Sequence, residues 1–440
     1  MLFSHCFMGS KGTMIFDQSE KLERTPLHGW RGTLPTPCWL ETPMQSHDKP
    51  DLTGTAYGRP AGQHDALLTE VGPGTPCGEF MRRYWHPVTL SERVSATPAR
   101  VRILGEDLIA FRDRNGRPGL LHNRCAHRGT DLFYGRVEPE GIRCCYHGWL
   151  FSVEGRCLDQ PCEKGGGAHR DRIRQPWYPV QERYGILWAY MGPPERMPLL
   201  PRWDILETIE PGLKLHVSHS SLYAGGDDDV EIVPCNWLQE WENVMDPFHI
   251  PVLHTSFSGV QFVLEMGVMP EVEWEYTDDG IRYTAYRKLD DGRELDRITA
   301  ASFPYVRLVP NVQLRHGAAG GVGFVVPVDD THFRLCFAMK IPEDQNALPR
   351  SPNLRPWSKM TEQERQQYPG DWEAQVGQGP ITFHNEEHLA TSDKGVGMLR
   401  RTLRQQIKAV QDGQDPAGVN FDPEKVMIRV EAGNWFRDPA

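Results

Sequence analysis

The sequence lacks any apolar run near the roughly 20 residues that a helix needs to cross a bilayer. Its first residues, MLFSHCFMGSKGTMIF, are interrupted by Ser, His, Gly and Lys, so they do not form the apolar region of a signal peptide. Basic residues are in the minority, with 48 Lys and Arg against 59 Asp and Glu. Because an acidic chain without a basic block attracts neither nucleic acid nor anionic lipid, we expect a cytoplasmic protein with no membrane and no nucleic-acid partner.

The composition has no strong bias, since hydrophobic residues make up 39% and charged residues 24% of the 440 positions. That length allows two domains, each with its own core. In a reducing compartment the ten cysteines are ligands or inert thiols more often than disulfides. The informative cysteines are therefore those that lie near histidine.

Turn and strand patterns divide the chain into three parts. Residues 1–66 are rich in Pro, Gly, Thr and charge and show no periodicity, which predicts a poorly ordered N-terminal extension. Residues 67–195 contain a short helix in GEFMRRYW, followed by alternating segments such as VRILGEDLIAFRD and GILWAYMG. Asn-Gly at 115–116 and Glu-Gly at 154–155 mark hairpin turns. This region is predicted to be a small β domain.

The third part, residues 196–440, mixes strands and helices. EVEWEYTDDGIRYTAYRKL predicts a hairpin with Asp279-Gly280 at its turn, and GFVVPVDDTHFRLCFAMKI predicts a second around Asp329-Asp330. A helical stripe follows at Val396, Leu399, Leu403, Ile407 and Val410. We therefore expect an α+β domain, with a sheet covered by helices.

A cluster of cysteine and histidine is the strongest chemical signal. Cys-Ala-His at 125–127 is followed by Cys-Cys-Tyr-His at 144–147. Two Cys and two His form the ligand set of a Rieske [2Fe–2S] centre, in which imidazoles raise the potential above that of an all-Cys cluster. A tetrahedral zinc site uses the same residue types but favours other spacings. The predicted ligands are Cys125, His127, Cys144 and His147, with Cys145 as a bystander.

A second cluster lies in CNWLQEWENVMDPFHIPVLH, residues 235–254. It contains Asp246, His249 and His254. Two His and one carboxylate can hold a non-heme Fe(II) on one face and leave the other open to O2 and substrate. Residues five apart point in different directions on a regular helix, so a break at Pro251 would help both imidazoles to reach one metal. Taken alone, the pattern fits a buried, satisfied histidine equally well.

Together these motifs resemble the Rieske non-heme iron ring-hydroxylating oxygenases. The resemblance covers roughly residues 67–410 and is strongest to phthalate dioxygenase-type α subunits, on LLTEVGPGTPCGEFMRRYW, NWLQ and DWEAQVGQGPI. It implies an all-β Rieske domain followed by a catalytic domain with a helix-grip (START-like) antiparallel sheet. It also implies a [2Fe–2S] cluster, a mononuclear Fe(II) and a homotrimer in which one subunit's cluster feeds the neighbour's iron.

The resemblance also assigns roles to two carboxylates. Asp246 would contact His249 in its own chain and a Rieske histidine such as His147 across the interface. Asp371 would be the third iron ligand, although Val376 stands where the related motif carries Glu. Other carboxylates remain open for that position, at Asp393, Glu386 and Glu387.

The implied activity is that of an oxygenase component. A NAD(P)H-dependent reductase with flavin and iron–sulfur centres would supply electrons, and O2 would be used to dihydroxylate an aromatic, carboxylated substrate. Monohydroxylation or O-demethylation of a methoxylated aromatic acid would use the same iron. Two other classes are weighed: a zinc hydrolase using the H-x-x-E-H set His384, Glu387 and His388, and an electron carrier without a working iron.

Overall fold

The computed structural model describes residues 53–220, 230–346 and 357–437. The chain separates into residues Met1–Pro60 and a compact unit, Ala61–Ala440, which contains every helix and strand given below. The expected disorder of residues 1–66 concerns mainly residues 1–52, which lie outside the described residues. Across the described ranges, no helix is both long enough and apolar enough to span a membrane.

The N-terminal part of the unit is built from short antiparallel strands, as predicted. Three small sheets have the orders β1-β10-β9, β2-β3-β4 and β5-β6-β7-β8. The predicted turn at Gly116 joins β3 to β4, and the one at Gly155 joins β7 to β8. The strands are β1 (Trp85–Leu90), β2 (Ala99–Ile103), β3 (Glu106–Arg112), β4 (Pro118–His122), β5 (Arg136–Glu138), β6 (Gly141–Arg143), β7 (Leu150–Phe151), β8 (Cys157–Asp159), β9 (Val180–Arg183) and β10 (Ile186–Tyr190).

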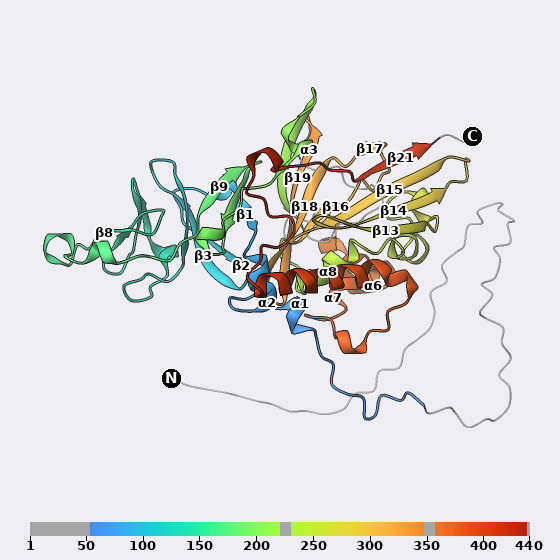
Figure 1. Cartoon of the computed structure of the whole chain (residues 1–440), viewed down its shortest axis with the longest axis horizontal. Coiled ribbons are helices and arrows are strands. Elements are labelled where there is room, and N and C mark those ends of the chain that lie inside the picture. The colour runs from blue at the N-terminus through green and yellow to red at the C-terminus, as the bar shows by residue number, and fades with distance from the viewer. Residues whose placement is uncertain (1–52, 221–229, 347–356, 438–440) are drawn as a thin grey trace, which may run out of the picture. The chain divides into compact units, whose positions relative to one another are not determined.

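A larger antiparallel sheet dominates the C-terminal part. Its order is β12-β19-β18-β16-β15-β14-β13, with β17 and β21 joined at β15 (Figure 1). The strands are β12 (Leu213–Ser220), β13 (Glu271–Thr277), β14 (Gly280–Lys288), β15 (Glu294–Ser302), β16 (Val306–Leu308), β17 (Gly317–Ala318), β18 (Gly321–Asp329), β19 (His332–Pro342) and β21 (Gly433–Arg437). A separate two-stranded parallel sheet is formed by β11 (Arg202–Trp203) and β20 (Met427–Ile428).

Both predicted hairpins of this sheet form, but their turns are shifted by one residue. Thr277 pairs with Gly280, so the first turn is Asp278-Asp279 rather than Asp279-Gly280. A Cβ at position 280 would lie 2.0 Å from the carbonyl oxygen of Ala301, so this glycine permits close approach of β15 instead of forming the turn. Asp329 pairs with His332, which places the second turn at Asp330-Thr331.

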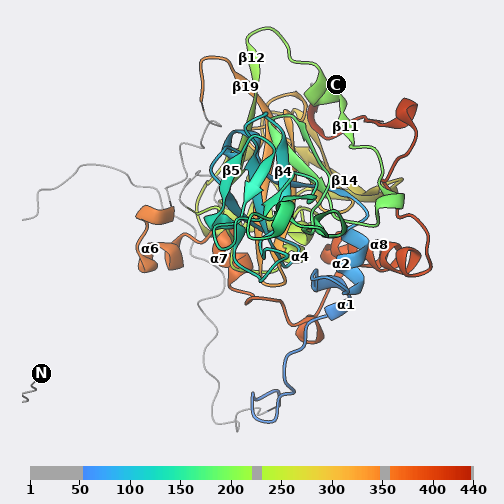
Figure 2. The same cartoon turned by 90° about the vertical axis from the view of Figure 1, so that its left-hand side faces the viewer.

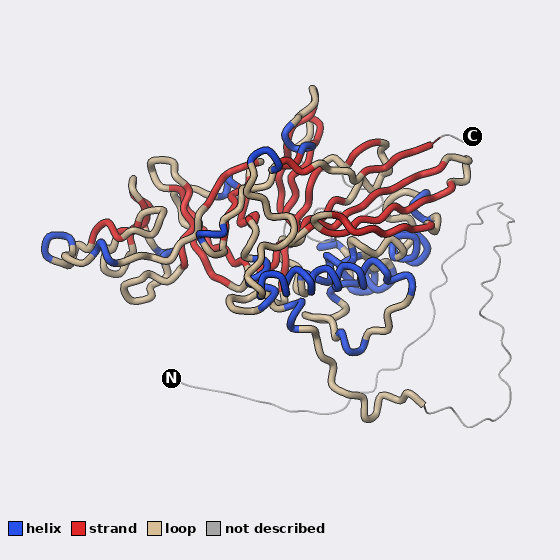
Figure 3. Tube along the Cα trace, in the orientation of Figure 1, coloured by secondary structure: helices blue, strands red, loops and turns tan. Residues whose placement is uncertain are grey.

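Helices cover one face of the large sheet. The long helix α8 (Lys394–Gln411) buries Val396, Leu399, Leu403 and Ile407, which confirms the predicted stripe. Helices α1 (Ala66–Thr69) and α2 (Pro76–Met81) pack against α8 (Figure 2). The remaining helices are α3 (Asp204–Glu207), α4 (Trp237–Asn243), α5 (His249–Pro251), α6 (Glu362–Gln367) and α7 (Asp371–Val376). The segregation of strands and helices in Figure 3 confirms the expected α+β class.

Candidate functional site

Two loops with the same backbone pattern carry the predicted cluster ligands. In the first, the Cys125 N–H donates to the Thr130 carbonyl (2.9 Å) and the Gly129 N–H donates to the Cys125 carbonyl (2.8 Å). In the second, Cys144 donates to Trp149 (2.9 Å) and Gly148 donates to Cys144 (3.1 Å). Both glycines have positive φ, +76° and +71°, which a residue with a side chain rarely adopts. Each loop therefore presents a cysteine at its base.

The four candidate ligands differ in burial in a way that suits their expected roles. Cys125 and Cys144 are each 4% exposed, whereas His127 and His147 are only partly buried. The two imidazole rings lie with centroids 4.6 Å apart, and Trp149 stacks on His127 at 4.2 Å. Nδ1 of His147 is buried and has no hydrogen-bond partner among the described residues. An imidazole nitrogen without a partner is suited to a metal.

The donor atoms of these loops fit a two-metal cluster better than a single zinc ion. Within the described ranges, only one group of three or more donors converges to within 4.8 Å, and that group lies elsewhere. A tetrahedral zinc would need all four donors around one point. A [2Fe–2S] cluster separates the thiolates from the imidazoles on different irons. Cys145 is exposed, consistent with its interpretation as a bystander.

A buried amide fixes the first loop to its surroundings. The side-chain oxygen of Gln175 accepts the Ala126 N–H at 2.7 Å, and its Nε2 donates to the carbonyls of His122 (2.7 Å) and Arg124 (2.9 Å). Arg143 supports the second loop by donating to the Gly148 carbonyl at 2.5 Å. Neither residue was singled out by the sequence, since only their contacts with the loops identify them.

The second candidate site depends on a π turn. His249 begins the short helix α5, and His254 lies in the turn η6 (Val252–Phe257), which is π-helical. The Ser258 N–H donates to the Leu253 carbonyl at 3.3 Å, an i to i+5 bond. Such a turn adds one residue to an α turn, so it brings side chains five apart towards one side. The sequence predicted a break at Pro251; Pro251 itself keeps helical angles at the end of α5, and the irregular turn begins at Val252.

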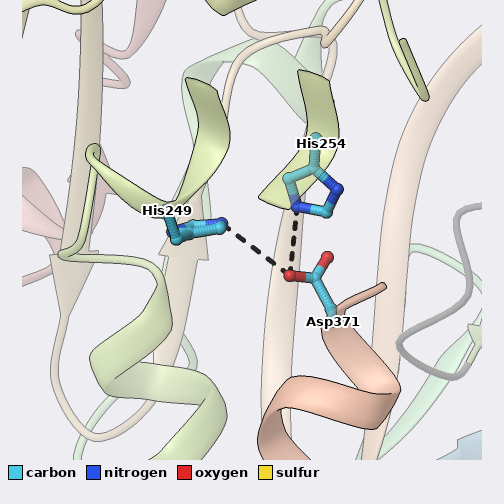
Figure 4. Close-up of side chains that lie close together, drawn as sticks. All are labelled: His249, His254 and Asp371. Carbon is cyan, nitrogen blue, oxygen red and sulfur yellow. Dashed lines mark hydrogen bonds and ion pairs between the residues drawn. The ribbon is translucent and has the colours of Figure 1, made fainter. Parts of the chain in front are cut away.

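Three side chains converge there, as Figure 4 shows. Asp371 Oδ1 lies 3.2 Å from His254 Nε2 and 3.7 Å from His249 Nε2. The carboxylate comes from the first turn of α7. Although burial raises the pKa of Asp371, the imidazoles of His254 and His249 outweigh it and hold the pKa below its ordinary value. Two imidazoles and one carboxylate are the donor set of a mononuclear Fe(II) site.

The outer nitrogen of each histidine is already engaged. His249 Nδ1 donates to the Asp246 backbone carbonyl at 2.6 Å and lies 3.5 Å from the Asp246 carboxylate. His254 Nδ1 donates to the Gln261 side-chain oxygen at 2.6 Å. These bonds fix each ring so that Nε2 points towards Asp371. Gln261 is a supporting residue that the sequence analysis missed.

Helix α7 is held in place by a buried polar network under the site. Gln375 donates to the Glu240 carboxylate at 2.8 Å, and Gln239 donates to the Gln375 carbonyl at 2.8 Å. Arg307 forms an ion pair with Glu240. Burial raises the pKa of Glu240, and the Arg307 guanidinium opposes this rise. The network fixes the helix that carries Asp371, and Val376 merely ends that helix and packs on the core.

The alternative carboxylates have other partners. Glu387 forms ion pairs with Arg400 (Oε1 to Nη2, 2.9 Å), and His384 Nδ1 accepts the Asp65 N–H at 3.2 Å. Asp393 accepts the Ala390 N–H at 2.7 Å. Residues 384–386 form only a 3₁₀ turn, so His384 and His388 do not share the helix face that a zinc hydrolase of this type requires. No metal-binding group in the described segments includes His384, Glu387 or His388.

The comparisons with known proteins concern the chain as a whole. The family model for a Rieske [2Fe-2S] domain matches residues 84–179. Phenoxybenzoate dioxygenase subunit alpha of Ectopseudomonas oleovorans is 52% identical over 386 residues, covering 87% of this chain and 94% of the relative. The oxygenase subunit of tert-butanol monooxygenase / tert-amyl alcohol desaturase of Aquincola tertiaricarbonis is 37% identical over 400 residues, covering 83% of this chain and 79% of the relative.

A third relative and a solved structure extend the comparison. The oxygenase subunit of 5,5'-dehydrodivanillate O-demethylase of Sphingobium sp. is 33% identical over 380 residues, covering 82% of this chain and 84% of the relative. The structure of NdmA of Pseudomonas putida CBB5 with caffeine has the same fold, with a TM-score of 0.55 and 17% identity, covering 77% of this chain and 94% of that one.

Proposed function

The chain belongs to the Rieske non-heme iron oxygenases as an oxygenase α subunit, and from this premise we propose that it oxidises an aromatic carboxylate. It is an oxidoreductase that incorporates O2, and its cofactors are a Rieske [2Fe–2S] cluster and a mononuclear iron. The observation that carries the proposal is the convergence of His249, His254 and Asp371 in a chain that also contains the two cysteine loops.

We assign the cluster to Cys125, His127, Cys144 and His147, and the iron to His249, His254 and Asp371. The buried thiols and the unpartnered His147 Nδ1 support the first assignment. The three convergent donors and their fixed rings support the second. When bound, the two centres supply electron transfer and O2 activation.

The protein's own residues position these groups. The Asp246 carbonyl and the Gln261 side-chain oxygen each accept a hydrogen bond from the Nδ1–H of one imidazole, which leaves Nε2 of both rings directed at Asp371. The buried Glu240 network keeps the Asp371 carboxylate facing them. The carboxylate of Asp246 is half-buried and 31% exposed, so it can contact a histidine of another subunit as well as His249.

We further propose a homotrimer, or a multiple of it, in which electrons cross between subunits. Figure 1 places β8, the end of the small sheet that flanks the cysteine loops, far from α7, which carries Asp371. A single chain thus offers a long path between its two centres, and a neighbouring subunit can offer a shorter one. An external flavin and iron–sulfur reductase would deliver electrons from NAD(P)H.

The first substrates to test are phenoxybenzoates, because the 52% identical relative is a phenoxybenzoate dioxygenase subunit. The iron-loaded protein would be incubated with O2, NADH, a surrogate reductase and a panel of phenoxybenzoates, phthalates and methoxybenzoates. Mass spectrometry of the products should show a gain of two oxygens and two hydrogens. The proposal fails if a protein with both metal sites filled gives no product from any aromatic acid.

A second candidate reaction is O-demethylation of a methoxylated aromatic acid, favoured by the 33% identical O-demethylase subunit. Loss of a methyl group with release of formaldehyde would identify it in the same panel. tert-Butanol belongs in the panel as a non-aromatic comparison, because the 37% identical relative is named for it. Turnover of tert-butanol without turnover of any acid would overturn the aromatic assignment.

A further inference from the structure

Two arginines lie fully buried on the inner face of the large sheet, on neighbouring strands. Arg287 on β14 is 2% exposed and Arg297 on β15 is 1% exposed. Arg287 pairs with Leu295, and Ala285 pairs with Arg297, so the guanidiniums project from the same face. Among the described residues, the hydrogen-bond acceptors of both arginines are carbonyl or amide oxygens and not carboxylates. Buried positive charge without a counter-charge is costly, which makes the partners of each guanidinium informative.

Arg297 has a structural set of partners. Its Nη1 donates to the Asn311 carbonyl (3.1 Å) and the Asn434 side-chain oxygen (2.8 Å), and its Nη2 donates to the Pro310 carbonyl (2.8 Å). These bonds connect β15 with β21 and the loop after β16. Arg307, another arginine of this sheet, is paired with Glu240. Neither Arg297 nor Arg307 has its guanidinium end free for a ligand.

Arg287 is different, because only one edge of its guanidinium is used. Its Nε donates to the Val268 carbonyl at 3.0 Å. Both Nη1 and Nη2 are buried and have no hydrogen-bond partner among the described residues. The bond at Nε fixes the plane of the group, so the two Nη atoms form a preset fork. That fork matches the two oxygens of a carboxylate.

The surroundings of Arg287 connect it to the candidate iron site. Val268, whose carbonyl accepts from Arg287, directly follows Gly267. Gly267 packs closely against Thr255, the residue after His254, because a Cβ at position 267 would lie only 2.5 Å from Cγ2 of Thr255. Leu295, opposite Arg287 on the next strand, belongs to a buried apolar cluster with Met266 and Ile250, the neighbour of His249. The buried fork and the segments that carry the two histidines therefore border the same buried apolar cluster.

We propose that Arg287 binds the carboxylate of the aromatic substrate through Nη1 and Nη2, and thereby determines which ring positions face the iron. The proposal rests on the proposed function, since it names the residue that would select the acid. Arg287 acts by positioning substrate, so its loss should weaken binding of the acid and loosen the position of oxidation. It should leave cluster and iron content unchanged.

The test compares a phenoxybenzoate with the matching phenoxybenzyl alcohol, which lacks the charge. Calorimetric titration of wild type should show tighter binding of the acid. Arg287→Met should weaken binding of the acid by about 100-fold and change binding of the alcohol by less than about threefold, because a buried charge-assisted pair is lost only for the acid. Arg287→Lys should fall between them. Arg282→Met, on the same strand but with its side chain paired to Glu275, is the matched control and should bind like wild type.

The protein's stability separates a ligand role from a structural one. Because Arg287 carries a buried charge without a counter-charge, Arg287→Met should have an unchanged or higher melting temperature in the absence of ligand. A clear fall in melting temperature for both the Met and Lys variants would assign Arg287 to the fold and overturn the proposal.

The two proposals fail in different ways. If wild type oxidises phenoxybenzoate but binds the alcohol equally well, or if Arg287→Met keeps the acid preference, the role of Arg287 is wrong and the oxygenase assignment stands. If wild type with both metal sites filled binds and oxidises no aromatic acid, the proposed function itself is wrong.

Discussion

His254 keeps one orientation because its Nδ1–H donates to the side-chain oxygen of Gln261, whose own amide donates to the Pro369 carbonyl at 3.1 Å. The bond fixes the tautomer in which Nε2 faces Asp371. Such indirect support commonly contributes 10–100-fold to metal affinity. At the residue scale, the site therefore depends on a side chain that touches no metal.

We expect Gln261→Leu to weaken iron binding by roughly 10–100-fold, because His254 would lose the acceptor that fixes its ring. Iron content after dialysis against a chelator series would measure the loss. The absorption of the iron–sulfur cluster should stay at the wild-type level. Gln405→Leu, at an exposed position of α8, is the control and should retain iron. Equal iron retention by both variants would contradict the support role.

How far the sequence predicted the site depends on the spacing of its residues. The cysteine and histidine of each loop lie two or three positions apart, so local spacing alone was enough to propose all four. Asp371 lies 117 residues from His254, and only a family resemblance could select it from its neighbours. Gln261, Gln175 and Glu240 escaped notice because glutamine and glutamate are common and their roles follow from burial, which the sequence does not encode locally.

At the scale of elements, the π turn η6 is the feature on which the proposed iron site depends. Deletion of Ser256 should convert the turn to a regular α turn and rotate His254 away from His249. We expect the variant to lose its iron and its oxygenase activity and to keep its cluster. Metal analysis together with cluster absorption would measure both. Retention of iron by the deletion variant would show that the π turn is dispensable.

A second element-scale prediction concerns pH. Glu207, at the end of α3, accepts from Arg202 Nη2 (2.6 Å) and Tyr184 Oη (2.5 Å), and the Arg202 bond, followed by Tyr184, lowers its pKa from 4.5 to about 2. A lowered carboxyl pKa stabilises the folded state above pH 4.5, and this contribution is lost as the pH falls from 4.5 to about 2.

Glu207→Gln should therefore be less stable than wild type at pH 7, by about 1 kcal/mol after allowance for solvent screening. The difference should shrink below pH 4 and vanish near pH 2. Urea unfolding at a series of pH values would measure it. A stability difference that does not change between pH 7 and pH 3 would mean that the charge of Glu207 contributes nothing.

Sequence patterns predicted the elements better than their ends. Alternation and the stripe on α8 identified strands and helix correctly. The turns of both large hairpins were misplaced by one residue; at the first of them, Gly280 was taken as a turn residue when its lack of a side chain serves strand packing. The π turn could not be predicted beyond a break at Pro251, since no residue pattern distinguishes it from other irregular turns.

At the scale of the whole molecule, the proposed trimer predicts complementation between two inactive variants. His147→Ala should lose the cluster function, and His254→Ala should lose the iron. If electrons cross between subunits, co-assembled trimers of the two should regain roughly one quarter of wild-type activity, the fraction of interfaces that join an intact cluster to an intact iron in a random mixture. Steady-state turnover of the co-purified mixture would measure it.

The homogeneous variants, mixed without co-assembly, are the control and should stay inactive. Activity of the co-assembled sample at the level of that control would place electron transfer within one chain. Asp246→Asn tests the same route by a different means: both metal sites should fill, and turnover should fall. Unimpaired turnover of Asp246→Asn would show that the carboxylate is not part of the path.

The π turn also has a genetic consequence. An enzyme whose metal site depends on one extra residue in a turn can lose its chemistry through the loss of a single codon, with every ligand still encoded. The product of such a deletion would still fold around its cluster and accept electrons, but it would pass them to no substrate. By this prediction, the loss of one residue from η6 would leave a protein that can be reduced but cannot oxidise a substrate.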